Sequence, residues 1–464
     1  MDPLSLHQVA ELARGMLVAG DSGLTVSRVS TDSRTLQPGD LFVPLRGDNF
    51  DGHRFVEQAS ERGAVGAMVE ESWKGETGKT FALIRVPDTL VGYQNLAAGY
   101  RNSLPLKVIA ITGSNGKTST KDFVAATLSR GFRVTKTEGN FNNHVGLPQT
   151  MLAASANDEI AVWEIGMNHP GEIAALAKLA RPDVAIVTNI GVAHIEFMGS
   201  REAIATEKGA LAEAIGAEGT VILNADDSFS EAIAARTSAK VVMAGIENGF
   251  IRASEVSQSA TGCEFTIMEG AHRCRAQLPV PGIHMVQNAM LAIAAGRTFG
   301  LSLEECAAGL ASAPLTKARL QIKKINGVQF IDDSYNANPD SMKAALRTLV
   351  ELEADGRRIA VLGEMSELGE ESERSHRDVG EAAAAFGIDE LIAVGKPGAG
   401  MARAAQKAGL KKSIAVDDAS EAAALLRENA LPGDLILVKG SRSARMERVL
   451  EMFSKQRSTA EATT

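Results

Sequence analysis

The stretch KVIAITGSNGKTST at residues 107–120 constrains the fold of this chain more than any other. Residues 108–111 form a short run of apolar and β-branched residues, which is typical of a buried strand in a parallel sheet. A glycine-rich turn follows at residues 113–118. Residues 119–130 then place apolar side chains on one face of an expected helix, which stops at Gly131. The sequence therefore predicts a strand, a glycine-rich turn and a helix in direct succession.

This arrangement is suited to binding phosphate groups. The glycines leave backbone N–H groups free, the positive end of the helix dipole faces the anion, and Lys117 adds a positive charge. The Thr118 hydroxyl is able to ligate Mg²⁺. The match to the usual G-x-x-x-x-G-K-[ST] pattern is imperfect, because Ile111 stands where the first glycine is expected. A glycine-rich turn with a solvated lysine is the competing interpretation, but the flanking strand and helix favour a nucleotide-binding site.

Length and composition predict a multi-domain α/β protein. A chain of 464 residues corresponds to about three domains. The 57 acidic residues exceed the 48 basic ones, which disfavours nucleic-acid binding. The three cysteines have no CxxC spacing and indicate a reducing compartment. Because no basic region precedes an apolar core near residue 1, and no apolar run reaches bilayer length, we expect a cytoplasmic protein without an integral membrane segment.

Three units are expected along the chain, at residues 1–103, 104–315 and 316–464. In the first unit, short strand-like runs alternate with a helix at residues 53–62. The polar turn at residues 31–34 is open to two interpretations, a capped turn or a grip for a diphosphate. In the third unit, alanine-rich helices alternate with strands expected at residues 328–332, 358–362, 390–394 and 434–439.

Polar residues follow the expected strands of the second unit. Glu164 lies near the end of one strand, and His194 follows the next. Ligands of an open α/β sheet bind at the carboxyl ends of its strands, so both side chains should share an edge with Lys117 and Thr118. A helix expected at residues 200–214 carries Lys208, whose direction the pattern leaves open.

Together these pieces resemble the Mur ligase family, the ATP-dependent amide-forming enzymes of peptidoglycan precursor synthesis. The resemblance covers nearly the whole chain. It rests on TGSNGKTST at 112–120, Glu164, GVAH at 191–194, EKG at 207–209, GIHMVQNAMLAIAA at 282–295 and DDSYNANPDS at 332–341. It implies a three-domain α/β fold: a central domain with a P-loop-type, mostly parallel sheet and helices on both faces, an α/β N-terminal domain binding a UDP-sugar, and a Rossmann-like C-terminal domain binding an incoming dipeptide.

Within the family, the chain resembles the branch whose substrates are UDP-N-acetylmuramoyl-tripeptide and D-alanyl-D-alanine. The motifs concerned are GNFNNHVGLP at 139–148, YNANP at 335–339, LGEMSELG at 362–369 and VKGSR at 438–442. The resemblance implies that a peptide carboxylate attacks the γ-phosphate of ATP, and that the dipeptide amine then attacks the resulting acyl phosphate. The products would be UDP-N-acetylmuramoyl-pentapeptide, ADP and phosphate, and the enzyme is expected to be a monomer.

ATP and Mg²⁺ are the implied cofactors. The implied catalytic residues are Lys117, Lys208, His194 and Arg319. The implied metal ligands are Thr118, Glu164, His194 and, if CO₂ carbamylates it, Lys208. The implied nucleotide-binding residues are Gly113, Ser114, Asn115, Gly116, Lys117, Thr118, Ser119, Asn288, Arg319, Asp333, Tyr335, Asn336 and Pro339.

The substrate contacts implied by the resemblance fall in all three domains. Those expected to face the UDP-sugar are Ser33, Arg34, Asn49 and His53. Those expected along the peptide are Asn142, Asn143 and His144. Those expected around the dipeptide are Glu364, Met365, His376, Lys439, Ser441 and Arg442. A free α-carboxylate needs a cation, which Arg442 or Lys439 would supply.

Three other functions remain open at this point. A sibling ligase of the family would add a single amino acid instead of a dipeptide. A nucleotide-gated binding protein would bind ATP without forming a product. A small-molecule kinase would release a stable phosphorylated product and no amide.

Overall fold

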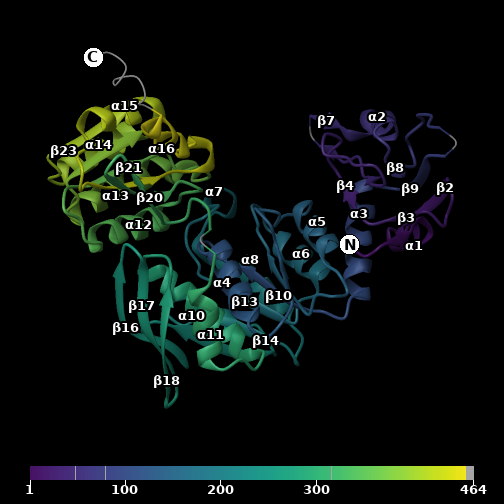
Figure 1. Cartoon of the computed structure of the whole chain (residues 1–464), viewed down its shortest axis with the longest axis horizontal. Helices are drawn as coiled ribbons and strands as arrows, with labels where there is room; N and C mark the ends of the chain where they lie inside the picture. Colours follow the sequence, from purple (N-terminus) through teal and green to yellow (C-terminus); the bar gives the residue numbers. More distant parts are fainter. Residues whose placement is uncertain (48, 79, 315, 456–464) are drawn as a thin grey trace, which may run out of the picture.

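The computed structural model describes residues 1–455 apart from 48, 79 and 315. Three α/β units follow one another along the chain, and the central unit lies between the first and the third (Figure 1). This arrangement and its mostly parallel sheets confirm the expected fold class. The expected domain boundary at residue 315 and the end of the chain at residue 464 lie outside the described residues.

The first unit contains a mixed sheet with the strand order β2-β9-β8-β5-β4. Its strands are β2 (Met16–Ala19), β4 (Val29–Ser30), β5 (Leu41–Phe42), β8 (Gly66–Glu70) and β9 (Ala82–Val86), and two short pairs join β1 (Leu4–Ser5) to β3 (Thr25–Val26) and β6 (Arg46–Gly47) to β7 (Phe50–Asp51). The helices are α1 (Leu6–Leu12), α2 (Val56–Glu61) and α3 (Thr89–Ser103). The helix expected at residues 53–62 is divided, because a 3₁₀ turn, η1 (Gly52–Phe55), precedes α2.

The central unit is built on a sheet with the order β11-β12-β10-β13-β14-β15-β16-β17-β18. Its strands are β10 (Lys107–Thr112), β11 (Val134–Lys136), β12 (Ile160–Glu164), β13 (Val184–Val187), β14 (Thr220–Asn224), β15 (Lys240–Gly245), β16 (Ile251–Ser259), β17 (Gly262–Glu269) and β18 (His272–Leu278). Strands β11 to β16 pair in parallel, whereas β16, β17 and β18 form an antiparallel extension. The sequence analysis did not predict this extension.

Helices cover both faces of the central sheet. They are α4 (Lys117–Leu128), α5 (Gly146–Ala153), α6 (Glu172–Ala180), α7 (Ile195–Met198), α8 (Arg201–Glu213), α9 (Ser230–Ala234), α10 (Ile283–Thr298) and α11 (Leu303–Ala311). One face shares its apolar core with the first unit, where Tyr100 packs among the same buried cluster as Val108. The other face packs on α4 and α10, in a cluster that continues into the third unit through Ile331 and Leu346.

The third unit has the strand order β19-β20-β24-β21-β22-β23. Its strands are β19 (Gln321–Ile325), β20 (Val328–Asp333), β21 (Arg358–Leu362), β22 (Glu390–Val394), β23 (Lys412–Val416) and β24 (Leu435–Lys439). Its helices are α12 (Pro339–Glu351), α13 (Ser372–Ala385), α14 (Gly398–Lys407), α15 (Ala419–Asn429) and α16 (Glu447–Ser454), with 3₁₀ turns η2 (Gly369–Glu371) and η3 (Arg442–Ala444). Only β19 runs antiparallel to its neighbour. Within the described ranges, none of the helices combines the length and apolar character that crossing a bilayer requires.

Candidate active site at the junction of the central and third units

The glycine-rich turn joins β10 to α4 in a shape that depends on two glycines. Gly113 and Gly116 have φ angles of +149° and +80°, which glycine adopts at little cost. A Cβ atom on Gly113 would lie 1.8 Å from the Oγ1 atom of Thr188, so the position has no room for a side chain. The first turn of α4 follows directly, and its N–H groups have no intrahelical acceptors. The predicted strand, turn and helix are therefore present, with the helix dipole directed at the turn.

Lys117 is the first residue of α4 and folds back over the turn. Its Nζ atom donates a hydrogen bond to the carbonyl oxygen of Gly113 at 2.7 Å. Burial lowers the pKa of Lys117 and is the largest influence on it. The positive charge of Arg319 acts in the same direction, whereas the negative charge of Glu164 opposes both. The ammonium group thus lies beside the helix N-terminus, where a phosphate oxygen could replace the carbonyl.

The turn is held against the loop that follows β13. Thr188 Oγ1 donates to the carbonyl of Asn115 at 2.5 Å, and the backbone N–H of Asn115 donates to the Asn189 side chain at 2.9 Å. The backbone N–H of Gly191 donates to Ser114 Oγ at 2.8 Å. The structure therefore brings Ser114 and Asn115 beside the 191–194 loop, as well as beside Lys117.

Glu164 ends β12 and faces the same helix N-terminus. Its carboxylate accepts hydrogen bonds from Thr118 Oγ1 at 2.9 Å and from Asn142 Nδ2 at 2.7 Å. Its backbone N–H donates to Thr137 Oγ1 at 2.9 Å, a contact that the sequence analysis missed. Carboxylate and hydroxyl oxygens are the ligands that Mg²⁺ prefers.

Few protein ligands surround this position. The part of the chain that the structure describes contains no group of three or more His, Cys, Asp or Glu side chains arranged to hold a metal ion. Mg²⁺ is usually bound through one or two carboxylates together with phosphate oxygens and water, so the pair Thr118 and Glu164 fits this ion in the presence of a nucleotide.

Lys208 points inward from α8 and is 1% exposed. The described residues provide its amine with no hydrogen bond. Burial holds the pKa of Lys208 well below its usual value, and the charge of Lys117 lowers it further, whereas Glu207 opposes both. The Glu207 carboxylate itself accepts hydrogen bonds from the N–H groups of Gly171 and Ile173, both at 2.8 Å. Lys208 is therefore a buried, unpaired amine near Lys117 of the glycine-rich turn.

His194 precedes α7 and faces the third unit. Its Nδ1 atom lies 2.6 Å from a carboxylate oxygen of Glu367. Hydrogen bonding to His194 lowers the pKa of Glu367. The sequence analysis did not single out Glu367, because nothing local distinguishes it from Glu364 or Glu370 in the same segment.

A cavity of about 290 Å³ lies between the central and third units. Predicted nucleotide-binding residues line it from both sides. They are Asn115, Gly116, Ser119, Asn288, Arg319 and Asp333, and Lys439 lines it as well. Burial lowers the pKa of His284, which also lines the cavity, to about 4, so this ring is neutral at physiological pH. The cavity therefore lies between the glycine-rich turn and the third unit.

Arg319 reaches from the third unit to the glycine-rich turn. A guanidinium nitrogen donates to Thr118 Oγ1 at 3.1 Å, and the guanidinium carbon lies 4.4 Å from the centre of the Tyr335 ring. Asn338 donates to the Asn115 side chain at 2.7 Å, and Pro339 begins α12 directly after it. These contacts bring the predicted residues of the two units to one site.

Lys439 supports the same side of the cavity. Its Nζ atom donates to Asp333 Oδ2 at 2.5 Å and to the carbonyl oxygen of Asn336 at 3.0 Å. Both acceptors are residues predicted to border the nucleotide. Lys439 is thus already paired inside the protein, which favours a role in shaping the nucleotide cavity over the predicted role of binding a dipeptide carboxylate.

The other predicted dipeptide contacts are more dispersed. His376 is buried: one ring nitrogen accepts from the N–H of Met365 at 2.9 Å, and the other lies 2.7 Å from the carbonyl oxygen of Ser372. Arg442 is exposed and pairs with Glu447 at 3.0 Å. Glu364 accepts from Ser443 Oγ at 3.0 Å, and Ser441 is buried beside it. His376 therefore supports the Glu364–Met365 backbone instead of presenting a free ring nitrogen.

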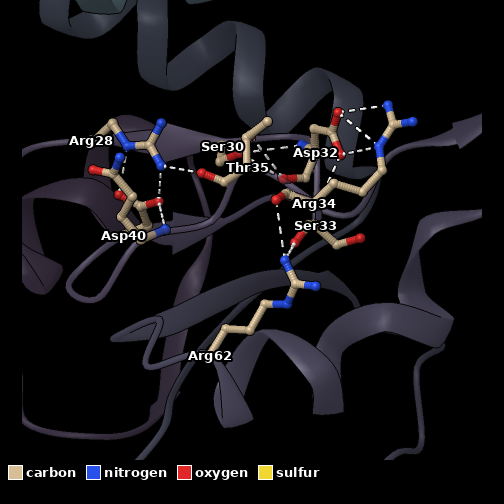
Figure 2. A network of polar contacts seen from close by, with 9 residues as sticks. Arg28, Ser30, Asp32, Ser33, Arg34, Thr35, Asp40 and Arg62 are labelled. Atoms are coloured by element: carbon tan, nitrogen blue, oxygen red, sulfur yellow. Dashed lines mark hydrogen bonds and ion pairs between the residues drawn. The ribbon is translucent and has the colours of Figure 1, made fainter.

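The polar turn of the first unit is held by its own residues (Figure 2). Arg34 pairs with Asp32 at 2.8 Å, and this hydrogen bonding lowers the pKa of Asp32 to about 2. Arg62 donates to the carbonyl oxygens of Ser33 and Arg34 at 2.9 and 3.1 Å. The Arg34 side chain is 85% exposed, so it is the cation of this turn that a ligand can reach.

His53 and the residues around it differ in their exposure. His53 is buried, with Nδ1 2.7 Å from Asp51 and Nε2 accepting from the N–H of Glu70 at 3.1 Å. Asn49 is exposed. Both ring nitrogens of His53 are therefore engaged, and its place in the fold favours support of the β6–β7 hairpin over direct contact with a ligand.

The three predicted peptide contacts of the central unit lie before α5. Asn142 contacts Glu164 as described above. The Asn143 side chain accepts from the N–H of Gly146 at 2.8 Å at the start of α5, and His144 is exposed. The carbonyl oxygen of His144 accepts from Gln94 of the first unit at 3.0 Å. This segment therefore connects the first unit to the edge of the central sheet that carries Glu164.

Three family models match successive parts of the chain. They are described as Mur ligase family, catalytic domain, at residues 25–79, Mur ligase middle domain at residues 111–296, and Mur ligase, glutamate ligase domain, at residues 318–442. Curated relatives match over almost the full length. A UDP-N-acetylmuramoyl-tripeptide–D-alanyl-D-alanine ligase of Bacillus subtilis is 41% identical, covering 96% of this chain and 97% of its own. The Escherichia coli protein of the same name is 37% identical, covering 98% and 99%.

Solved structures agree with these matches. The chain is similar to MurF from Acinetobacter baumannii, with a TM-score of 0.90 and 33% identity over 98% of this chain and 100% of that one. MurF ligase from Thermotoga maritima, solved in complex with ADP, has a TM-score of 0.82 and 29% identity over 92% and 97% of the two chains.

Proposed function

The chain belongs to the Mur ligase family, and from this membership we propose that it joins D-alanyl-D-alanine to UDP-N-acetylmuramoyl-tripeptide at the expense of ATP. The products are UDP-N-acetylmuramoyl-pentapeptide, ADP and phosphate. The observation that carries this proposal is that Arg319 of the third unit, which lines the cavity, reaches Thr118 at the glycine-rich turn, where Glu164 and Lys117 also lie. The full-length similarity to relatives that carry this activity in their names supports the choice of substrates.

ATP is proposed to bind with its phosphates on the Gly113–Lys117 turn and its base in the cavity beside Asn288 and Asp333. The relative from Thermotoga maritima, which was solved with ADP, supports nucleotide binding by this fold. Mg²⁺ would be held by Thr118 and Glu164, with His194 as a further ligand. When bound, it would neutralise phosphate charge and polarise the transferred phosphoryl group.

Charge stabilisation is the main contribution of the protein to this chemistry. A carboxylate and a triphosphate are both anions, so the first step depends on cations that hold them together. Lys117 and Arg319 approach the turn from opposite units and are placed to stabilise the charge that develops on the γ-phosphate. The acyl phosphate then reacts with the dipeptide amine, and phosphate leaves. Because one cation comes from each unit, their docking completes the site.

Lys208 is proposed to act as a carbamate. A lysine with a depressed pKa provides the neutral amine that reacts with CO₂, and the carbamate would carry negative charge toward the metal and Lys117. The absence of a hydrogen-bond partner for this amine among the described residues supports the idea, since a carbamate would gain partners there.

The remaining assignments complete the proposal. Arg34 and Asn49 would contact the UDP-sugar, and the 142–144 segment would follow its peptide. The first, central and third domains would extend over residues 1–103, 104–315 and 316–464. The enzyme would act as a monomer in the cytoplasm, where its precursor substrate and ATP are available.

An acceptor comparison tests this function. Purified protein is incubated with ATP, Mg²⁺ and UDP-N-acetylmuramoyl-tripeptide, and phosphate release is followed with D-alanyl-D-alanine or with single amino acids. We expect phosphate release with the dipeptide and a pentapeptide product by mass spectrometry. Release only with a single amino acid would assign the chain to a sibling ligase. ATP binding without any product would favour a nucleotide-gated binding protein, and a stable phosphorylated product without an amide would indicate a kinase.

A further inference from the structure

The third unit holds the 191–194 loop of the central unit at two points. Glu367 places a carboxylate oxygen 2.6 Å from Nδ1 of His194. Asp340, at the start of α12, accepts a hydrogen bond from the N–H of Val192 at 3.1 Å. A Cβ atom on Gly191 would lie 2.3 Å from Asp340 Oδ2, so the close approach of this carboxylate requires glycine. Two carboxylates of one unit therefore fix a single loop of the other.

The backbone at this contact is unusual on both sides. His194 and Glu367 have φ angles of +64° and +61°, in the left-handed region that residues other than glycine rarely adopt. Such conformations persist where surrounding contacts enforce them, and they concentrate at functional sites. Here the N–H of Glu196 donates to the carbonyl of Glu367 at 3.4 Å, and a Cβ atom on Gly369 would lie 3.0 Å from Glu196 Cγ. The two segments are thus packed backbone against backbone.

The chemistry of the pair decides which ring nitrogen remains available. An ionised carboxylate only accepts hydrogen bonds, so its approach to within 2.6 Å favours a proton on Nδ1 of His194. The other nitrogen, Nε2, then keeps its lone pair. A carboxylate that accepts from one nitrogen of a histidine in this way fixes the tautomer and the ring orientation of metal-binding histidines.

We propose that Glu367 is a positioning residue that holds His194 as the Nδ1–H tautomer with Nε2 directed at the metal–phosphate site. The inference rests on the proposed function for the identity of that site. Glu367 belongs to the third unit and His194 to the central unit. The His194 ring is therefore held in the correct orientation only when the third unit is docked. Glu367 would thereby couple domain docking to the metal site without touching substrate.

The test compares Glu367→Ala and Glu367→Gln with Glu370→Gln as a matched control. Glu370 lies in η2, is exposed and forms no ion pair among the described residues, so its substitution removes a charge from the same segment only. Mn²⁺ affinity is measured by electron paramagnetic resonance in the presence of a non-hydrolysable ATP analogue. We expect Glu367→Ala to weaken Mn²⁺ binding and to lower kcat by about 10- to 100-fold, with little change in the KM for the dipeptide. Glu367→Gln keeps an acceptor oxygen, so it should recover part of the Mn²⁺ affinity and part of kcat. Glu370→Gln should match the wild type.

A second readout needs neither metal nor turnover. The ¹⁵N resonances of the His194 ring, assigned with His194→Gln, report the tautomer in the metal-free protein. We expect the Nδ1–H form in the wild type and in Glu370→Gln, and a mixture of tautomers in Glu367→Ala. Identical ring spectra and Mn²⁺ affinities for Glu367→Ala and Glu370→Gln would overturn the inference. If the wild type forms no amide product, the proposed function fails, whereas the ring spectra still decide the role of Glu367.

Discussion

Two arginines cross the boundaries between units, and their surroundings differ. Arg101 extends from α3 and donates to the carbonyl oxygens of Ala180 and Arg181 at 3.0 and 3.2 Å, where α6 ends. Arg319 extends from the third unit to the Thr118 hydroxyl at the glycine-rich turn. The first arginine closes the end of a helix, whereas the second contacts a residue of the proposed chemistry.

The same contrast holds for the two boundaries as a whole. The first unit shares a continuous apolar core with one face of the central sheet, and Tyr100 in α3 donates to the carbonyl oxygen of Ala154 at 2.8 Å. The third unit contacts the site itself, through Arg319, Asn338 and Glu367. We infer that the first boundary mainly contributes stability and that the second controls activity. The predictions below are ordered by the size of the effect that this contrast implies.

Lys117→Ala should have the largest effect. The substitution removes the cation that begins α4, and we expect kcat to fall by about 10³-fold or more, because a cation at the transferred phosphate is worth that much in related phosphoryl transfers. Steady-state phosphate release measures the loss. Near-normal activity would contradict the assignment of the turn as the phosphate site.

Lys208→Ala should lower kcat by about 10²-fold if the working species is a carbamate that ligates the metal. Short carboxylates such as acetate should restore part of the activity, because they supply the missing anion. Activity is measured with and without added carboxylate, and Lys208→Gln serves as a control of similar length. Wild-type activity in Lys208→Ala would exclude the carbamate role.

Arg319→Ala should lower kcat by about 10²-fold while changing the thermal unfolding temperature little, because its contact is with the site and not with a core. Arg319→Lys keeps the charge but loses the planar fork, so we expect an intermediate value. Unchanged kcat in both variants would contradict the inference that the boundary between the central and third units controls activity.

Arg101→Ala should show the opposite pattern and the smallest effect on activity. The loss leaves the carbonyl of Ala180 without this donor, which should lower the free energy of unfolding by about 1–3 kcal/mol. We expect kcat to stay within about twofold of the wild type. Denaturant unfolding and phosphate release are measured on one preparation. A large fall in kcat without loss of stability would contradict the inference that the first boundary mainly contributes stability.

The sequence predicted the parts of the fold that local patterns determine. β10, the glycine turn and α4 follow one another within about 20 residues, so propensity and turn chemistry suffice to place them. The antiparallel extension β16–β18 was missed although β16 alternates, and β18 gives a weak signal because it buries only Ala276 and Leu278.

The side-chain pairings of the site were less predictable. Lys117, Glu164 and Arg319 come from distant positions. Lys117 and Glu164 were identified from the glycine-rich turn and from a strand end, whereas Arg319 was identified through the family resemblance. Their contacts, and those of Glu367, depend on how the two units dock. His53 and His376 show the limit of this approach, since a histidine in a motif can be buried and bonded to backbone groups on both sides.

The proposed reaction begins when a peptide carboxylate attacks the γ-phosphate at the junction of the central and third units. Isotope transfer tests it most directly. UDP-N-acetylmuramoyl-tripeptide labelled with ¹⁸O in its terminal carboxylate is converted with ATP and D-alanyl-D-alanine, and the released phosphate is analysed by mass spectrometry. An acyl phosphate predicts one ¹⁸O atom in each phosphate released. Unlabelled phosphate alongside the amide product would rule out attack of the carboxylate on the γ-phosphate.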